Sequence, residues 1–314
     1  PGGIGERRRI EAVTEQTTVD IAGHRLTITR PSKLLWPAMG ITKLEYLTRL
    51  AELAPYLLRY CRDRYLTAVR CPDGVGGQSF YQKNCPRPAP PFVRTARHGD
   101  VEYVVPDSLP TLLWLGNLAC LEFHVSFHRV GDELPAEWII DIDPPGDREP
   151  RLARAALLVG ETLDRMNVRS VPKTSGASGI QIWVPIRRGY TFEQLRSVGR
   201  FVGEYLVRLH SDLFTVARRK ADRGNRIYID YLQHWRGKTL AAPYTPRATP
   251  FAGVSMPLTW DEIERGADPR EFNLRTARDR LERTGDLLAA TPPQSLDHVL
   301  DALGAGSPAA RRTR

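Results

Sequence analysis

Short runs in which apolar and polar residues alternate recur along the chain, and this pattern predicts β-strands. The runs cover residues 19–28, 66–70, 101–105, 121–127, 137–143, 179–186 and 226–232. Between several of them the apolar positions recur every three or four residues, as in an amphipathic helix. Because the two patterns alternate, the sequence predicts an α/β fold in which helices flank a mixed central β-sheet.

Three threonines mark expected helix starts. Thr42, Thr191 and Thr259 each precede a Glu or Gln by three residues, which is the pattern of a capping box. Pro55 lies inside the first of these helices and is expected to break or kink it. The expected buried stripe of that helix is Leu44, Leu47, Ala51, Ala54, Leu57 and Leu58. The helical pattern recurs over residues 150–166 and 192–210.

The composition is that of an ordinary globular protein. The 314 residues are 41% apolar and 26% charged, which excludes wholesale disorder, collagen-like repeats and a disulfide-stapled miniprotein. No run approaches the roughly 18 apolar residues of a membrane span, so we expect a soluble protein of the cytoplasm. The four cysteines form no C-x-x-C pair, and reduced buried thiols are a better interpretation than a zinc site.

The charge balance favours a polyanionic partner. Lys plus Arg number 45 against 36 Asp plus Glu, which gives a net charge of +9. Nucleic acid is the commonest such partner, because its binding releases condensed counterions. An excess of this size also occurs in proteins that bind only nucleotides or no charged ligand. A basic run at residues 217–226 fits either a nucleic-acid contact or a solvated loop.

Paired carboxylates are the strongest chemical signal. Asp141 and Asp143 lie two residues apart in a predicted strand, so both side chains are expected on one face of the sheet. Asp230 lies within another predicted strand, over residues 226–232, between apolar neighbours. Three such aspartates suit one or two Mg²⁺ or Mn²⁺ ions for phosphoryl or nucleotidyl transfer. The alternative is that the pair before Pro-Pro is a turn with Asx-type hydrogen bonds.

Two other features suit a bound anion. Ser175, Gly176 and Gly179 form a tight loop before a strand, where open backbone amides and a hydroxyl can bind phosphate. Lys43 follows the Thr42 cap, where a cation is disfavoured by the helix dipole unless an anion binds the open amides there. Three cations after Asp230 add to the same neighbourhood: Arg236, Lys238 and Arg247.

Six segments, in order, resemble the polymerase domain of the bacterial ATP-dependent DNA ligase D, a branch of the archaeo-eukaryotic primase superfamily. They are SKLLWPAMGITK, RCPDGVGGQSFYQKNCP, LACLEFHV, IIDIDPPG, TSGASGIQIWVPI and IDYLQHWRGKTLAAPYTPR, and the resemblance runs from about residue 18 to 303. It implies template-directed addition of nucleotides to a DNA end or gap, with ribonucleotides often preferred and manganese favoured.

The resemblance also implies roles for individual residues. Asp141, Asp143 and Asp230 look like the catalytic residues that bind two divalent ions. The residues expected to bind the nucleoside triphosphate are His124, Ser175, Gly176, Gln181, Gln233, Lys238 and Arg247. Those expected to contact the DNA 5′-phosphate are Lys33, Lys43 and Lys83. Phe80 and Tyr81 match an aromatic pair that stacks on template bases, which suits any template because every base has a π-face.

Two positions depart from the family's pattern. Ser178 stands where the loop usually has a basic residue, and Gln181 stands where it usually has His. The resemblance implies that the family's basic residue and histidine contact phosphates. With Ser178 and Gln181 in their places, nucleotide affinity is expected to be weaker or differently distributed. The departures keep open a non-catalytic adaptor that binds DNA ends or gaps. Clustered aspartates alone also leave open a two-metal nuclease, and the same site chemistry leaves open primer synthesis.

The domain organisation implied by the resemblance is a primase-like catalytic core preceded by an N-terminal lobe. We expect a flexible basic N-terminus over residues 1–17, lobes over 18–134 and 135–303, and a basic tail over 304–314. Expected partners are gapped or broken DNA with a 5′-phosphate, an ATP-dependent DNA ligase and an end-binding protein, with the chain a monomer near the bacterial nucleoid. No ligase or nuclease motif appears, so an excised domain and a stand-alone paralogue both remain open, as do end joining and excision repair.

Overall fold

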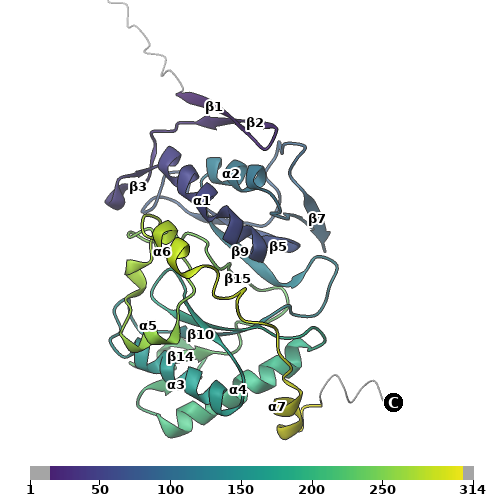
Figure 1. Ribbon diagram of the computed structural model, residues 1–314, viewed down its shortest axis with the longest axis vertical. Helices are drawn as coiled ribbons and strands as arrows, with labels where there is room; N and C mark the ends of the chain where they lie inside the picture. The colour runs from purple at the N-terminus through teal and green to yellow at the C-terminus, as the bar shows by residue number, and fades with distance from the viewer. Residues whose placement is uncertain (1–14, 307–314) are drawn as a thin grey trace, which may run out of the picture.

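The computed structural model describes residues 15–306, and two β-sheets form its framework (Figure 1). The first sheet has the strand order β15-β9-β5-β6 and is antiparallel throughout. Its strands are β15 (Thr239–Ala241), β9 (Cys120–Arg129), β5 (Arg64–Arg70) and β6 (Phe80–Gln82). This sheet lies near the middle of the molecule in Figure 1, below the N-terminal helices and above the second sheet.

The second sheet has the strand order β11-β12-β10-β14-β13. Its strands are β11 (Val171–Thr174), β12 (Ile180–Val184), β10 (Trp138–Asp143), β14 (Ile227–Asp230) and β13 (Phe214–Thr215). Only the β13–β14 pair is parallel among these. The helices α3 (Leu152–Arg165) and α4 (Phe192–Leu209) pack against it at the bottom of Figure 1. Trp138, Ile140 and Ile142 are buried in the main core, as the alternation in this segment predicts.

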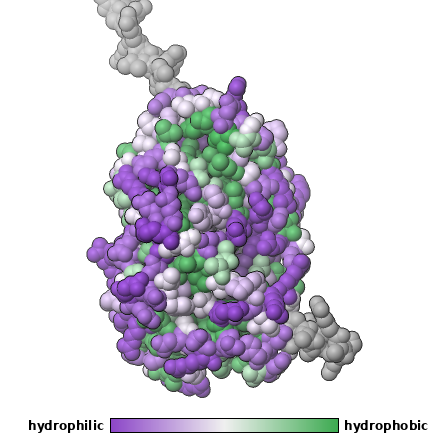
Figure 2. All heavy atoms as spheres, in the orientation of Figure 1, coloured by the Kyte–Doolittle hydropathy of each residue, from purple (hydrophilic) through white to green (hydrophobic). Residues whose placement is uncertain are grey.

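The upper half is completed by α1 (Lys43–Cys61), which packs against α2 (Leu109–Asn117). Short hairpins flank these helices. They are β1 (Gln16–Ile21) with β2 (His24–Thr29), β3 (Leu34–Trp36) with β4 (Ile41–Thr42), and β7 (Thr95–His98) with β8 (Val101–Val104). The face in Figure 2 is largely hydrophilic, with apolar residues gathered mainly in this upper half.

The C-terminal part of the chain runs back over both halves. It contains α5 (Trp260–Glu264), α6 (Ala277–Thr284) and α7 (Asp297–Ala302), and α6 contacts α1. Just after α6, the carboxylate of Asp286 accepts hydrogen bonds from the hydroxyls of Tyr60 on α1 and Tyr244. These contacts hold the C-terminal segment against the N-terminal helix. In the part of the chain that the structure describes, no helix is long and apolar enough to cross a membrane.

The predicted helix starts are confirmed, because the hydroxyls of Thr42, Thr191 and Thr259 each accept the amide three residues later. Two expectations about α1 are wrong. Pro55 does not break the helix, which continues through it to Cys61. Leu44 is exposed, and the buried face is rotated toward other positions. The buried positions that the expected stripe omitted are Lys43, Tyr46, Leu50, Leu53 and Cys61.

The boundaries differ from expectation in two places. The run at residues 19–28 is a hairpin rather than one strand, because Ala22 and Gly23 turn with positive φ angles. Strand β1 begins at Gln16, so the last two residues of the expected N-terminal tail are ordered in a strand. Residues 1–14 of that tail, and the tail after residue 306, lie outside the described residues. A division into lobes near residue 135 remains a prediction, and β15 shows that the chain later returns to the first sheet.

Candidate active site

Three aspartates lie on two adjacent inner strands of the second sheet, β10 and β14. Asp141 on β10 is the direct cross-strand partner of Asp230 on β14, and Asp143 lies two residues further along β10 on the same face. Burial and the nearby Asp143 and Asp230 carboxylates raise the pKa of Asp141 to about 7. Burial and Asp230 also raise the pKa of Asp143, although Arg223 and Lys220 oppose this. The like charges are therefore within Coulombic reach of one another.

The chemistry of this donor set fits a hard divalent cation, because carboxylate oxygens are the ligands such ions prefer. In the structure, however, the three side chains do not point at a common position for a metal ion. Among residues 15–306 no group of three or more His, Cys, Asp or Glu side chains is arranged to hold a metal ion. Asp230 Oδ1 instead accepts hydrogen bonds from the Tyr228 hydroxyl and the Leu232 amide, each at 3.0 Å. Metal binding at this site requires rotation of these side chains while the strand ladder keeps the backbone spacing.

The loop between β11 and β12 presents one hydroxyl. Ser175 Oγ accepts the amides of Ala177 at 3.2 Å and Gly179 at 3.1 Å, so its lone pairs are used and its hydrogen is free to donate. The expectation that the loop's amides are open is wrong for Ala177 and Gly179, because both amides donate to the Ser175 hydroxyl. Gly176 has φ +75°, and an added Cβ would lie 2.5 Å from Arg247 Cγ. A glycine is therefore required where the loop meets Arg247.

The first sheet contributes a second polar group. His124 on β9 lies 2.6 Å from Glu122, measured from Nε2 to Oε2, and Glu122 also accepts the amide of Ala248. Arg247 joins the two sheets, because its guanidinium donates to the Ser175 carbonyl and its Nε lies 2.9 Å from Glu122 Oε2. That last pair is an ion pair with poor hydrogen-bond alignment, since Arg247 Nε has no well-aligned acceptor.

The electrostatics of this group favour an ionised Glu122 beside a neutral His124. Burial works against the Glu122 charge, but the hydrogen bond to His124 and the charge of Arg247 lower its pKa to about 2. Burial lowers the pKa of His124, although Glu122 opposes the shift. Sequence reasoning assigned Glu122 no role. The available signal is that it alternates with His124 on the polar face of one strand, and only the fold shows that it is buried.

A buried lysine was also missed. Lys173 on β11 is fully buried, and its Nζ donates to Gln181 Oε1 and, at 2.5 Å, to Ser255 Oγ. Gln181 on β12 is the cross-strand partner both of Lys173 and of Asp141. The residue that departs from the family's pattern at position 181 thus stands between a buried ammonium and the aspartate site.

The loop after β14 is less clearly part of the site. Gln233 donates to the Thr239 carbonyl at 3.1 Å, and Lys238 donates to the Leu232 carbonyl at 2.9 Å, so both side chains are tied to their own loop. Arg236 was expected near the carboxylates, but it pairs with Glu193 at the start of α4. The basic run before β14 comes closer, since Lys220 and Arg223 act on the Asp143 pKa.

Exposed aromatic residues lie on the edge strand β6. Phe80 is 39% exposed and Tyr81 is 69% exposed, unusual values for large apolar or aromatic side chains on a folded surface. The Tyr81 ring meets the His124 ring edge-on at 6.0 Å between centroids, which brings the aromatic edge next to the nucleotide-side residues. Lys83 follows β6 and is exposed. This edge is suited to stacking against bases, with a cation beside it.

Two of the three lysines expected to bind a 5′-phosphate, Lys33 and Lys43, lie close together but differ in exposure. Lys33 forms a 3.2 Å ion pair with the exposed Asp73. Lys43 is buried, and its Nζ donates to the carbonyls of Thr29 at 2.6 Å and Asn117 at 2.9 Å. Burial, together with the charges of Arg30 and Lys33, lowers the pKa of Lys43 to about 8. The cluster therefore carries an excess of positive charge.

The expectation of open amides at the start of α1 is wrong. The amide of Lys43 donates to the Lys33 carbonyl, that of Leu44 to the Pro31 carbonyl, and that of Glu45 to the Thr42 hydroxyl. Any anion bound here would be held by side chains, not by the helix start. The sequence argument failed because the competing carbonyls come from the segment before β3.

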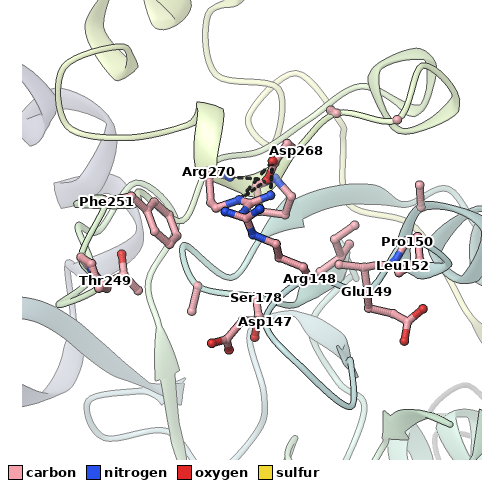
Figure 3. A pocket seen from close by; sticks show the side chains of 17 residues that line it. Asp147, Arg148, Glu149, Pro150, Leu152, Ser178, Thr249, Phe251, Asp268 and Arg270 are labelled. Atoms are coloured by element: carbon pink, nitrogen blue, oxygen red, sulfur yellow. Dashed lines mark hydrogen bonds and ion pairs between the residues drawn. The ribbon is translucent and has the colours of Figure 1, made fainter. Parts of the chain in front are cut away.

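A cavity of about 580 Å³ opens behind the Ser175 loop (Figure 3). Ser178 and Asp147 lie on one side of it, and the paired Asp268 and Arg270 lie on the other. Three carboxylates and two guanidinium groups line it, so the cavity does not supply the positive charge that Ser178 lacks. We therefore do not assign it to the triphosphate.

The chain is similar to a known protein family over most of its length. The family model described as LigD, primase-polymerase domain, matches residues 42–288. The bifunctional non-homologous end joining protein LigD of Bacillus subtilis is 35% identical over 280 residues, which are 87% of this chain and 46% of that protein. The multifunctional non-homologous end joining protein LigD of Mycolicibacterium smegmatis is 32% identical over 275 residues, covering 84% of this chain and 36% of that protein.

The chain thus spans less than half the length of these curated relatives. A solved structure of similar size also matches it: the polymerase domain from Mycobacterium tuberculosis Ligase D in complex with DNA. The two share a TM-score of 0.78 and 27% sequence identity, with 85% of this chain and 97% of that chain covered. The match confirms the expected α/β fold.

Proposed function

The chain belongs to the LigD primase-polymerase family of nucleotidyltransferases, and from this premise we propose that it adds nucleotides, preferably ribonucleotides, to 3′ ends at short DNA gaps or breaks. The reaction is template-directed and the downstream strand carries a 5′-phosphate. The observation that carries the proposal is the direct pairing of Asp141 with Asp230 across adjacent strands, with Asp143 beside them.

The aspartates are the proposed metal ligands. Asp141, Asp143 and Asp230 would hold two divalent ions, Mn²⁺ or Mg²⁺, which when bound lower the pKa of the primer 3′-hydroxyl and neutralise the triphosphate. The chain's own residues position the nucleotide. The Ser175 hydroxyl has a free hydrogen to donate to a phosphate or ribose oxygen, and Arg247 supplies positive charge beside it. Glu122 keeps both His124 and Arg247 in place.

The remaining proposed nucleotide contacts are Gly176, Gln181, Gln233 and Lys238. Gly176 permits the close approach of Arg247, and Gln181 provides an amide beside Asp141. Gln233 and Lys238 have to leave their loop carbonyls to reach a triphosphate. Their contribution to binding is therefore expected to be smaller than that of Ser175 or Arg247.

The DNA contacts proposed on the other side of the site are Lys33, Lys43 and Lys83 for the 5′-phosphate, and Phe80 with Tyr81 for template stacking. The cation cluster around Lys43 and the exposed aromatic edge support these roles. The similarity to a polymerase domain solved in complex with DNA supports DNA as a partner. We further propose action in non-homologous end joining, with a ligase and an end-binding protein as partners, by a monomer with lobes that meet near residue 135.

A primer-extension assay tests this function. On a gapped duplex with Mn²⁺ and each nucleotide type, the chain should extend the primer, and Asp141→Ala with Asp143→Ala should abolish extension while gap binding persists. Asp279→Ala on the exposed face of α6 is the matched control and should leave extension unchanged. Binding without incorporation by the unaltered chain would support the adaptor instead, and metal-dependent degradation of the duplex would support the nuclease. Either result would overturn the polymerase proposal.

A further inference from the structure

A row of polar side chains crosses the second sheet at one level. Lys173 on β11 is the cross-strand partner of Gln181 on β12, Gln181 is the partner of Asp141 on β10, and Asp141 is the partner of Asp230 on β14. Directly paired residues of antiparallel strands project to the same face of a sheet. The row therefore has a cation at one end, carboxylates at the other, and one neutral amide between them.

The buried ammonium fixes which way the amide points. Burial lowers the pKa of Lys173 to about 7, and the charge of Asp141 opposes this shift. In its charged form Lys173 Nζ can only donate, so the Gln181 atom facing it is the carbonyl oxygen, Oε1. The amide nitrogen of Gln181 then faces away from β11. A carboxylate can only accept, so this nitrogen is the Gln181 atom that is able to donate to Asp141, its cross-strand partner. An amide that is free to flip would otherwise present oxygen to Asp141, which is repulsive.

The hydrogen-bond partners of Lys173 are other buried groups of the protein. It is fully buried, and its second partner, Ser255 Oγ at 2.5 Å, is itself fully buried. The ammonium therefore does not reach a nucleotide directly. Gln181 is only 2% exposed, and its strand β12 lies between β11 and β10. An ion kept in such a place costs desolvation, which is offset here by the hydrogen bonds to Gln181 and Ser255 and by the charge of Asp141.

We propose that Lys173 is a positioning residue for nucleotide binding, holding the Gln181 amide group so that it donates toward Asp141 and the triphosphate. Gln181 has two amide hydrogens, so one serves Asp141 and the other is available to a phosphate oxygen. The Lys173–Gln181 pair thereby supplies a fixed donor where the family's pattern has a histidine. The inference rests on the proposed function, because it assumes that a nucleoside triphosphate binds beside Asp141.

The test compares Lys173→Met, Gln181→Leu and the double variant. Calorimetric titration with ATP and Mn²⁺ and without DNA should show affinity about tenfold weaker in each single variant, the loss expected for one hydrogen bond to a charged group. The double variant should bind no more weakly than Gln181→Leu alone, because Lys173 acts only through Gln181. In primer extension, each single variant should have a raised KM for the nucleotide and a smaller change in kcat.

Ser255→Ala is the matched control, since it removes the other partner of Lys173 and leaves the contact with Gln181. It should bind ATP within about twofold of the unaltered chain. Unchanged ATP affinity in Lys173→Met, or a further loss when Lys173→Met is added to Gln181→Leu, would overturn the proposal. If Lys173→Met does not fold, Gln181→Leu probes the pair from the other strand, and unaltered ATP affinity in that variant would overturn it equally. An unaltered chain that neither binds ATP nor extends a primer would instead overturn the proposed function.

Discussion

Two regions of the molecule gather side chains of a single charge, and they are built in different ways. In the acidic region, Asp141 and Asp230 face each other on paired strands, so the backbone ladder sets their spacing. In the basic region, Lys33 precedes a short hairpin and Lys43 begins α1, and Lys43 is held by carbonyls of Thr29 and Asn117. The acidic region therefore has a fixed backbone with adjustable side chains. The basic region depends on side-chain hydrogen bonds for its shape.

Their electrostatics are mirror images. Burial, reinforced by neighbouring charges of the same sign, raises the pKa of Asp141 to about 7 and lowers that of Lys43 to about 8. Each region therefore favours a ligand of the opposite charge, a cation in one case and an anion in the other. The difference in construction predicts that altering the acidic region changes chemistry without loss of stability. Altering the basic region should change both DNA preference and stability.

The sharpest way to break this comparison is to remove one charge from the acidic region. Asp230→Asn keeps the shape of the side chain but removes a proposed metal ligand. Primer extension with Mn²⁺ should fall by about a hundredfold to a thousandfold, as for other groups that stabilise charge in a transition state. The melting temperature and gap binding should stay close to those of the unaltered chain. Extension within about tenfold of normal would contradict the role of Asp230.

The basic region should respond with a smaller effect on activity. Lys33→Ala combined with Lys43→Met should reduce the preference for a 5′-phosphorylated over an unphosphorylated gap by about 30-fold, from the loss of two charge-assisted hydrogen bonds. Binding to both gaps, measured by fluorescence anisotropy, gives the preference. Arg165→Ala removes an exposed charge from α3 and is the control. A preserved preference would remove both lysines from the phosphate site.

Lys43→Met alone sharpens the same comparison through stability. Because Lys43 ties the end of β2 to the end of α2, the melting temperature should fall by about 2–4 °C, whereas Lys33→Ala should leave it unchanged.

Glu122→Gln tests whether the nucleotide-side residues depend on a buried carboxylate. The substitution keeps the size of the side chain but weakens its contacts with His124 and Arg247. The KM for the nucleotide should rise about tenfold, with a smaller change in kcat, because the residue positions groups that bind the nucleotide and does not itself react. Steady-state extension over a range of nucleotide concentrations measures both. A lowered kcat at unchanged KM would argue against this positioning role.

The smallest expected effect concerns stability in the presence of a chelator. The folded-state pKa of Asp141 is raised above its unfolded value, so its contribution to stability is lost as pH rises from about 4 to about 7. With EDTA at pH 8, Asp141→Asn should therefore raise the melting temperature by about 2–4 °C, and at pH 4 the gain should disappear. A gain that is the same at both pH values would contradict the electrostatic origin of the effect.

Much of the acidic region could be predicted from local pattern. The alternation at residues 137–143 placed Asp141 and Asp143 on one face, and the caps at Thr42, Thr191 and Thr259 located three helices. The pairing of Asp141 with Asp230 could not be derived from pattern, because the register between strands about 90 residues apart is set by tertiary packing. The strand pattern proposed Asp230 as a third ligand and the family resemblance assigned it the same role, but neither gave the register that pairs it with Asp141.

The residues that sequence reasoning missed share one property, which is burial of a charged group. Glu122 and Lys173 lie in strands, where a charge usually marks the solvent face, and only the fold shows that both side chains are buried. The open amides expected at Lys43 failed for a related reason. Their carbonyl partners come from the Pro31–Lys33 segment, whose path is not encoded in the helix itself. Local signals predicted elements well and hydrogen-bond partners poorly.

The central claim is that Asp141, Asp143 and Asp230 hold divalent cations beside a nucleotide. Anomalous diffraction at the manganese edge, from crystals grown with Mn²⁺ and a nucleoside triphosphate, tests it most directly. The account predicts manganese peaks about 2.0–2.3 Å from carboxylate oxygens of all three aspartates, with the triphosphate extending toward Ser175 and Arg247. Manganese bound elsewhere, or a triphosphate bound away from these aspartates, would contradict it.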